Sequence, residues 1–467
     1  MKNFSLIFIL FLNLLITACG GGDSNSNNSN AELPVVIKPE LPAVTKTENF
    51  ITQFGITWYF DKAYTTGKFA NGDNYVVGPV KIVGINPPSA LSNGRTINGS
   101  MVNPSPLEGN KQGYDSSTYS TTFVAAKNVA RPNNQGLSAS NPLELSINSS
   151  LVSSISHANP GNRPQLQSAS ILTVLGSIPS EGSFRPSYSN TDKTIKFNKS
   201  QINYSLFSSL TPAANAPSLA TVERQFERAW IDHMPGWSAR FIHPIDNMSD
   251  YGREIASDIG TGALTLNLNY SNADKETLAI RFIQLGIDLH GIIEAGGTST
   301  WSPDGGHASG RKLPILLAGH VLNDNAMKNI GQRTDVLFGE DAQTFYVSQT
   351  DVDNTNSGSW SPDTRGGTPE TYQASDIALP EWGIRHSTHP FKDNKAWSAM
   401  YRTCCTGNAW SGTVLTAHIM GLKTSWNHNA LFDYQDRYMN TTAFGDYSRN
   451  AGNTFQERMW DTYRSMY

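Results

Sequence analysis

The sequence predicts an α+β protein of more than one domain, with a β-rich N-terminal half and a helical C-terminal half. Short alternating apolar segments, broken by turn dipeptides, occupy the first half, whereas apolar spacing near 3.6 residues dominates the second. The length of 467 residues allows two or three domains. The net charge of −4 and the lack of any basic block make nucleic acid an unexpected partner.

The first residues have the features of a secretory signal peptide. An apolar run over residues 4–16 follows Lys2 and is too short for a stable membrane span. The segment Ile16-Thr17-Ala18-Cys19 resembles a bacterial lipobox. The resemblance implies that residues 1–18 are removed, that Cys19 is lipidated, and, because Gly20 follows, that the protein reaches the outer membrane. A plain signal peptide with an incidental cysteine is the alternative. We therefore expect a lipid-anchored, extracytoplasmic protein on the periplasmic or cell-surface face.

Residues 19–48 are rich in Gly, Ser, Asn and Pro, a composition that predicts a flexible tether. Residues 49–210 form the expected β-rich domain. Leu143, Leu145 and Ile147 alternate with polar residues, and dipeptides such as Asn71-Gly72 recur as turn signals. Many short strands with this punctuation favour an antiparallel β-sandwich. Its role is left open between carbohydrate binding, a cleft wall and structural support.

Residues 211–217 are expected to be a linker, and residues 218–467 a helical domain. The cluster 271–274 supplies an N-cap signal for the most regular of the expected helices. The region from about 338 to 380 reads as loop. The expected helices cover 218–230, 251–269, 274–294, 313–327, 408–422, 429–439 and 453–467.

Paired helices of this length, joined by long decorated loops, resemble an (α/α) toroid. That architecture is common in polysaccharide lyases and in several glycoside hydrolase families. The resemblance covers the helical half at the level of pattern, and no catalytic motif of a named family is matched. It implies that the loops at one end of the helix pairs converge on a central cleft, so the helical domain is the expected catalytic domain.

Four segments of the helical half concentrate Trp, Tyr, His, Arg and carboxylates: 301–312, 380–386, 397–410 and 426–437. Trp faces stack on sugar rings, Arg forks bind carboxylates, and His or Tyr transfers protons. The candidate catalytic residues are His307, Tyr401, Arg311, Arg402 and His386, and the candidate substrate-binding residues are Trp301, Asp304, Glu381, Trp382, Arg385 and Asn408.

These residue types suit β-elimination on a uronic-acid polysaccharide such as alginate or ulvan. His307 or Tyr401 would act as base and acid. An arginine, among Arg311, Arg402 and Arg385, would neutralise the charge that grows on the substrate carboxylate. Asn408 and His386 would support this set, and the implied partner is an anionic polysaccharide.

Two other functions remain open. A glycoside hydrolase needs two carboxylates, and Asp304 with Glu381 is the best local pair. A surface lipoprotein that only binds glycans would also explain the anchor and the aromatic residues. No cofactor or catalytic metal is expected, and no EF-hand pattern indicates structural Ca²⁺. Cys404 and Cys405 form either a vicinal disulfide or two free thiols.

Overall fold

The computed structural model describes most of the chain after the expected tether. Within it, Leu41–Tyr467 forms one compact unit. Cys19 and His386 lie outside the described residues, and so does the side chain of Tyr401. No described helix combines the length and the apolar character needed to cross a membrane. The described residues are 44–118, 121–132, 136–248, 252–362, 369–385, 388–392, 399–440 and 454–467.

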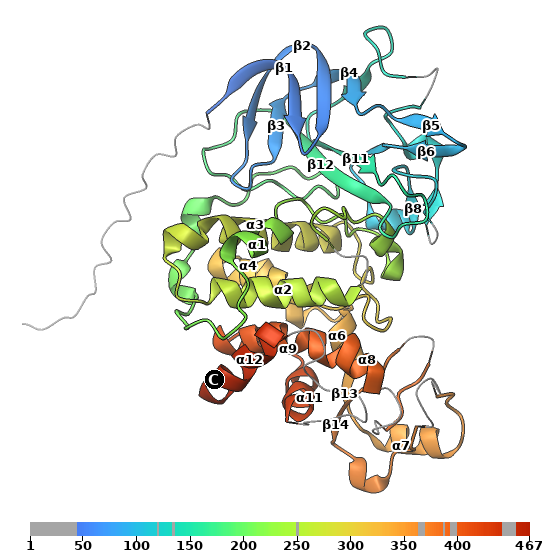
Figure 1. The fold of residues 1–467 in the computed structure, drawn as a ribbon, viewed down its shortest axis with the longest axis vertical. Coiled ribbons are helices and arrows are strands. Elements are labelled where there is room, and N and C mark those ends of the chain that lie inside the picture. Colours follow the sequence, from blue (N-terminus) through green and yellow to red (C-terminus); the bar gives the residue numbers. More distant parts are fainter. Residues whose placement is uncertain are drawn as a thin grey trace, which may run out of the picture. The chain divides into compact units, whose positions relative to one another are not determined.

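The expected β-rich region is confirmed as a curled sheet of eight strands, in the order β10-β4-β2-β3-β12-β11-β7 with β1 paired to β2 (Figure 1). It differs from the expected antiparallel sandwich, because β3 pairs with β12 in parallel. The long strand β2 pairs with three neighbours, and its register shifts against β1 and β4 bend the sheet. The strands are β1 (Lys46–Gln53), β2 (Ile56–Lys68), β3 (Asn74–Val77), β4 (Val80–Asn86), β7 (Ser100–Val102), β10 (Leu143–Leu145), β11 (Ser149–Ser156) and β12 (Leu166–Leu175).

Two hydrophobic cores lie on opposite faces of this sheet. Neighbouring residues of β11 and β12 divide between them because side chains alternate across a strand. Leu151 and Leu172 belong to the core inside the curl. Val152 and Ile171 belong to the larger core, which continues into the helices. Both faces of these strands are therefore buried, and the second face is what holds the sheet to the helical region.

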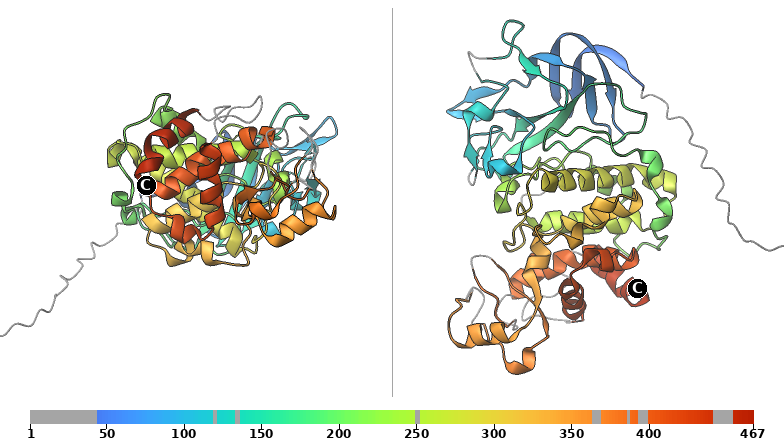
Figure 2. Two further views of the ribbon diagram at one scale, coloured as in Figure 1. Left: turned by 90° about the horizontal axis from the view of Figure 1, so that it is seen from below. Right: turned by 180° about the vertical axis from the view of Figure 1, so that it is seen from behind.

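The helical region is confirmed, although its first two helices end at Gln225 and Leu266 rather than at the expected residues 230 and 269. Its longest helix, α3 (Asn272–Glu294), begins as the cap signal predicts, because the Ser271 hydroxyl accepts from the Asp274 N–H at 3.1 Å. In Figures 1 and 2, α3 and α4 lie beneath the sheet, α2 lies below them, and α9, α11 and α12 are farther away. The other main helices are α1 (Leu219–Gln225), α2 (Gly252–Leu266), α4 (Lys312–Val321), α9 (Gly407–Ile419), α11 (Asn429–Met439) and α12 (Thr454–Tyr463).

Two stretches depart from the expected elements. The helix expected over 313–327 is divided, because Asn323 has a φ of 56° and Asp324 caps a new short helix, α5 (Asn325–Lys328). The region expected to be loop contains α6 (Gly339–Gln343), β13 (Thr344–Tyr346) and α7 (Gln349–Asn356), and β13 pairs with β14 (Pro380–Trp382). Each of these elements is too short to show a clear hydrophobic period.

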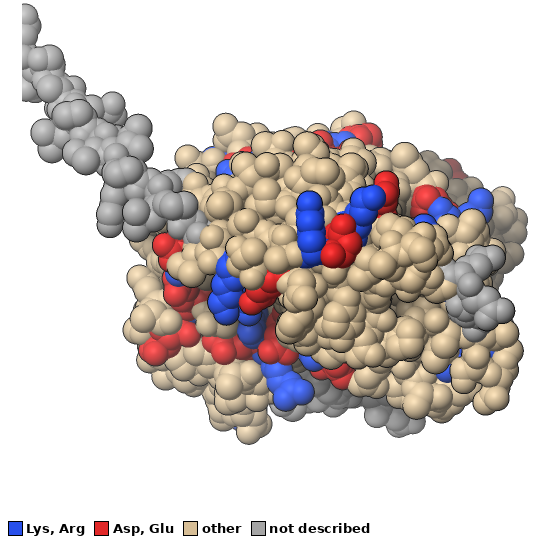
Figure 3. Space-filling view, turned by 90° about the horizontal axis from the view of Figure 1, so that it is seen from above, with Lys and Arg blue, Asp and Glu red and all other residues tan. Residues whose placement is uncertain are grey.

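Basic and acidic side chains lie close together on the face shown in Figure 3, where most of the surface is uncharged. Exposed pairs such as Lys81 with Glu144, at 2.8 Å, illustrate this local compensation in the β-rich region. Neither sign of charge forms a separate patch on that face.

Candidate functional site

The segment between α3 and α4, residues 295–311, meets several elements at close range. A Cβ atom on Gly252, the first residue of α2, would lie 2.1 Å from the Cα of His307. A Cβ atom on Gly306 would lie 2.7 Å from the carbonyl oxygen of Cys405. Glycine is therefore required at both contacts, because any side chain would push the backbones apart. The segment is fixed between the start of α2 and the junction of α8 (Ala399–Cys404) with α9.

His307 lies beside an aromatic and basic group that sequence analysis did not select. Its ring centroid is 6.0 Å from that of Trp237, and the two planes are inclined by 61°. The Arg240 guanidinium lies 5.9 Å from the centroid of the same Trp237 ring. Trp237 and Arg240 are partly exposed on the 3₁₀ helix Gly236–Phe241, and Asp304 is partly exposed in the neighbouring loop. This arrangement combines an aromatic face, a proton-transferring group and a cation.

Arg311 is engaged inside the protein. Its side chain is 2% exposed, and its Nε and Nη2 donate to the two carboxylate oxygens of Asp232 at 2.7 and 3.2 Å. Its Nη1 donates to the carbonyl oxygens of His307 and Ser309 at 3.2 and 2.8 Å. Arg311 thus holds the shape of the loop that carries His307, and this buried position suits a structural role better than contact with a substrate.

Asp232 is the centre of a buried polar network. Burial by itself would raise the pKa of Asp232. The Arg311 charge and the hydrogen bond from His243 outweigh this effect and lower the pKa to about 2. Its backbone N–H donates to the Tyr188 hydroxyl at 2.9 Å, and its carbonyl accepts from the Trp301 indole at 3.2 Å. Burial also lowers the pKa of His233 to about 3 and that of His243. Both imidazoles are therefore neutral near pH 7.

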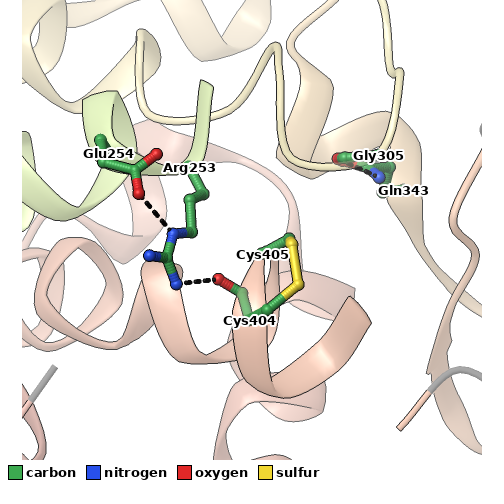
Figure 4. The surroundings of a disulfide bond; sticks show 6 residues. All are labelled: Arg253, Glu254, Gly305, Gln343, Cys404 and Cys405. Atoms are coloured by element: carbon green, nitrogen blue, oxygen red, sulfur yellow. Dashed lines mark hydrogen bonds and ion pairs between the residues drawn. A yellow bond between two sulfur atoms is a disulfide. The ribbon is translucent and has the colours of Figure 1, made fainter. Parts of the chain in front are cut away.

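The two cysteines form a vicinal disulfide, which settles the alternative left open by the sequence. Figure 4 shows this disulfide beside the start of α2. Arg253 donates from Nη1 to the Cys404 carbonyl at 2.7 Å and from Nε to Glu254 at 2.7 Å. The disulfide junction is thus attached to α2 by a cation, next to the glycine contact that positions the His307 loop.

The segment 380–386 also reaches this loop. The Gln343 side chain donates to the carbonyl oxygens of Gly305 and Ile384 at 2.8 and 2.9 Å, and the Gly305 N–H donates to the Ile384 carbonyl at 3.0 Å. Figure 4 shows the first of these contacts. The structure therefore brings together the backbones of 301–312, of the described residues 380–385 and of the Cys404–Cys405 junction.

Several of the selected side chains are nevertheless enclosed, and His307 itself is only 7% exposed. Trp301 and Trp382 are 1% and 0% exposed, so neither ring presents a face to a substrate. Glu381 is fully buried, 3.4 Å from Arg437. Arg385 lies over the ring of Phe345, at 5.8 Å, rather than beside His307.

In the segment 397–410, the side chains that the structure describes begin at Arg402 and are mainly buried. The Asn408 side chain is buried and donates to Glu457 at 2.6 Å. Arg402 is 6% exposed on α8, and Tyr401 belongs to the same helix. His307 is thus the selected residue that contacts the aromatic and basic group of Trp237 and Arg240.

Sequence analysis missed Trp237 and Arg240 because their segment has no clear helical period. The turn signal Pro235-Gly236, followed directly by an aromatic residue, was the available sign that a polar loop displays Trp237. The contact with His307 is what makes Trp237 a candidate site residue.

Comparison with protein-family models, curated proteins and solved structures finds no match to this chain. Among the residues that the structure describes, no group of three or more His, Cys, Asp or Glu side chains is placed to hold a metal ion. The protein has mixed α and β content, and only its own residues indicate the chemistry of the site.

Proposed function

We propose that the protein is a polysaccharide lyase that cleaves a uronic-acid-containing polysaccharide by β-elimination. The observation that carries the proposal is the contact of His307 with the partly exposed Trp237, which also lies beneath Arg240. A tryptophan face can hold a sugar ring while an imidazole takes the proton next to the sugar carboxylate. A nearby guanidinium stabilises the charge that grows on that carboxylate.

In this proposal His307 is the base, Arg240 is the neutraliser, and Tyr401 is the second proton-transferring group. The wider (α/α)-toroid arrangement is also part of the proposal. The packing of α2 on α9 and of α3 on α4 supports it. The identity of the polymer is limited to the class that carries carboxylates.

Hydrolysis by Asp304 and Glu381 has less support. Glu381 is fully buried, faces Arg437 at 3.4 Å, and accepts from the backbone N–H of Trp382 at 3.1 Å. A carboxylate enclosed in this way cannot approach a glycosidic bond or activate a water molecule. A protein that only binds glycans would have no need of a histidine beside the aromatic face.

The chemistry can be tested by incubating the protein with alginate, ulvan and polyglucuronate. We expect one of these polymers to shorten while ultraviolet absorbance rises, because elimination leaves a conjugated double bond in the new terminal sugar. Chain shortening without this absorbance, together with loss of turnover in Asp304→Asn, would support hydrolysis instead. Unchanged chain length with all uronate polymers would contradict the lyase proposal.

We also propose that Cys19 is lipidated and anchors the protein at the outer membrane, on the periplasmic or cell-surface face. The support is the lipobox-like segment 16–19 after the short apolar run. In Cys19→Ala we expect unprocessed precursor or soluble protein, because no thiol remains to accept the lipid. Cell fractionation and metabolic labelling with a fatty acid give the readout. A Cys19→Ala variant that is processed and anchored like the parent would contradict the proposal.

A further inference from the structure

A shallow cleft of about 550 Å³ lies where the β11–β12 loop meets the helical region. Segments that are distant in sequence form its walls. Asn162 and Arg163 come from the loop between β11 and β12, and Asp258 comes from α2. The remaining lining residues belong to α1 and to the segment before α2: Thr221, Arg224, Gln225, Ile245, Asp246, Asn247 and Met248.

The two arginines give this cleft its positive charge. Arg163 and Arg224 are exposed, and no residue in the described ranges forms an ion pair with either guanidinium. The acidic residue Asp246 is already engaged, since Arg228 lies 3.3 Å from it and the Gln167 side chain donates to it. Both arginines line the cleft without an ion-pair partner among the described residues, a setting that favours an anion such as a carboxylate.

Asp258 is mainly neutral below about pH 7, so in that range it does not cancel this charge. Its carboxylate oxygen accepts from the Gln225 Nε2 at 2.9 Å. Burial, and then the nearby charge of Glu254, raise the pKa of Asp258 to about 7. Below this value the carboxyl is neutral and can donate a hydrogen bond to a ligand oxygen.

The buried part of the wall contains acceptors that lack donors. Asn247 is 6% exposed, and its Nδ2 donates to the backbone carbonyls of Gln225 and Arg228 at 3.1 and 3.2 Å. These two bonds orient the amide, so its Oδ1 is left without a donor among the described residues, as is the Oε1 of Gln225. Unpaired buried acceptors are costly, and hydroxyl groups of a ligand are suitable donors for them.

The His307 loop contacts the first residue of α2, and the cleft is lined by a residue near the middle of the same helix. Gly252, which contacts His307, and Asp258 are separated by six residues, or about 9 Å along the helix axis.

We propose that this cleft is a second subsite for an anionic sugar residue, in which Arg163 and Arg224 bind a carboxylate and the walls accept from ring hydroxyls. The choice of a uronate as the anionic sugar rests on the proposed lyase function. The subsite increases the affinity for long chains and takes no part in bond cleavage.

The test compares the double variant Arg163→Ala/Arg224→Ala with Lys62→Ala/Lys111→Ala, which removes two exposed charges from the β-rich region. The probes are an oligoglucuronate, a neutral gluco-oligosaccharide of the same length and a sulfated form of that neutral oligosaccharide. Calorimetry at constant ionic strength should show roughly tenfold or greater loss of oligoglucuronate affinity in the arginine variant. The lysine control should bind like the parent. With a polymer that the parent cleaves, KM should rise while kcat is unchanged.

The pH dependence gives an independent readout. The charged groups around Asp258 are Glu254 on its own helix, Arg224 on α1, and Arg163 and Asp246 from the flanking loops. Between pH 6 and pH 8 Asp258 loses its proton, so oligoglucuronate should bind more weakly at the higher pH. Asp258→Asn stays neutral and should remove this dependence.

The possible results distinguish the proposed subsite from the proposed lyase activity. Unchanged oligoglucuronate affinity in the arginine variant, or an equal loss with the neutral probe, would overturn the subsite. Tighter binding of the sulfated probe, with the same dependence on the arginines, would overturn the assignment to a uronate. Arginine-dependent binding without chain cleavage or absorbance would support the subsite and refute the lyase activity.

Discussion

Replacing Arg311 by methionine should destabilise the protein by about 3–5 kcal/mol, because it leaves a buried carboxylate without its partner. Asp232 is fully buried, and both of its oxygens accept from Arg311. The change also removes the donor that holds the carbonyls of His307 and Ser309. Denaturant unfolding at pH 7 measures the loss. Arg311→Lys should also destabilise, since an ammonium group cannot reproduce the planar fork.

The matched control is Arg333→Ala. Arg333 is one-third exposed and pairs with Asp335 at 2.7 Å and with Glu294. Removing such an exposed pair should change stability by only about 0–1 kcal/mol. If Arg311→Met unfolds like the parent but fails to bind substrate, the structural role is contradicted and Arg311 contacts the substrate instead.

The ion pair of Arg311 with Asp232 should also make the stability of the fold depend on pH. The pKa of Asp232 falls from an ordinary 3.8 to about 2 in the folded protein. A carboxyl whose folded pKa is depressed contributes stability that is fully present above the unfolded pKa. This contribution should therefore be complete above about pH 4 and should disappear as the pH falls through 2. Unfolding measured across this range in the parent and in Arg311→Met separates it from other acid effects.

Replacing His307 by alanine should lower turnover of the uronate polymer by roughly 10²–10⁴-fold, the loss expected when a proton-transferring group is removed. The backbone carbonyl that accepts from Arg311 is retained, so the fold should survive. Polymer should still bind, because Trp237 and Arg240 remain. The measurement is the initial rate of absorbance increase at saturating polymer, with binding followed separately.

His157→Ala in the β-rich region is the matched control, and its turnover should equal that of the parent. Tyr401→Phe provides a second arm, since it removes only the phenolic oxygen. Normal turnover and an unchanged pH profile in His307→Ala would exclude this residue as the base. If turnover is lost only in Tyr401→Phe, both proton transfers would be assigned to the tyrosine.

Much of the fold could be predicted from local signals in the sequence. The cap at Ser271 and the apolar stripe that follows it predicted α3 within two residues of its observed start. The alternation at Leu143 and Leu145 likewise predicted strand β10. Helix caps and residue periodicity act over a few positions, so they can be recognised without knowledge of the fold.

The candidate site could be predicted only in part. The sequence indicated that the loop with His307 and Asp304 carries unusual chemistry, and the structure places this loop where several segments meet. The sequence could not indicate which charged residues face one another. Arg311 and Asp232 are 79 positions apart, and their pairing removes Arg311 from the surface.

The sequence by itself determined the order of the β-rich and helical regions and the position of the chemically rich loop. The tertiary structure decided which of the side chains there are exposed. Trp301 and Trp237 are the same residue type, yet one is enclosed against Phe338 and the other is partly exposed beside His307. The physical reason is that burial depends on packing between distant segments, whereas helix and strand formation depends mainly on neighbours along the chain.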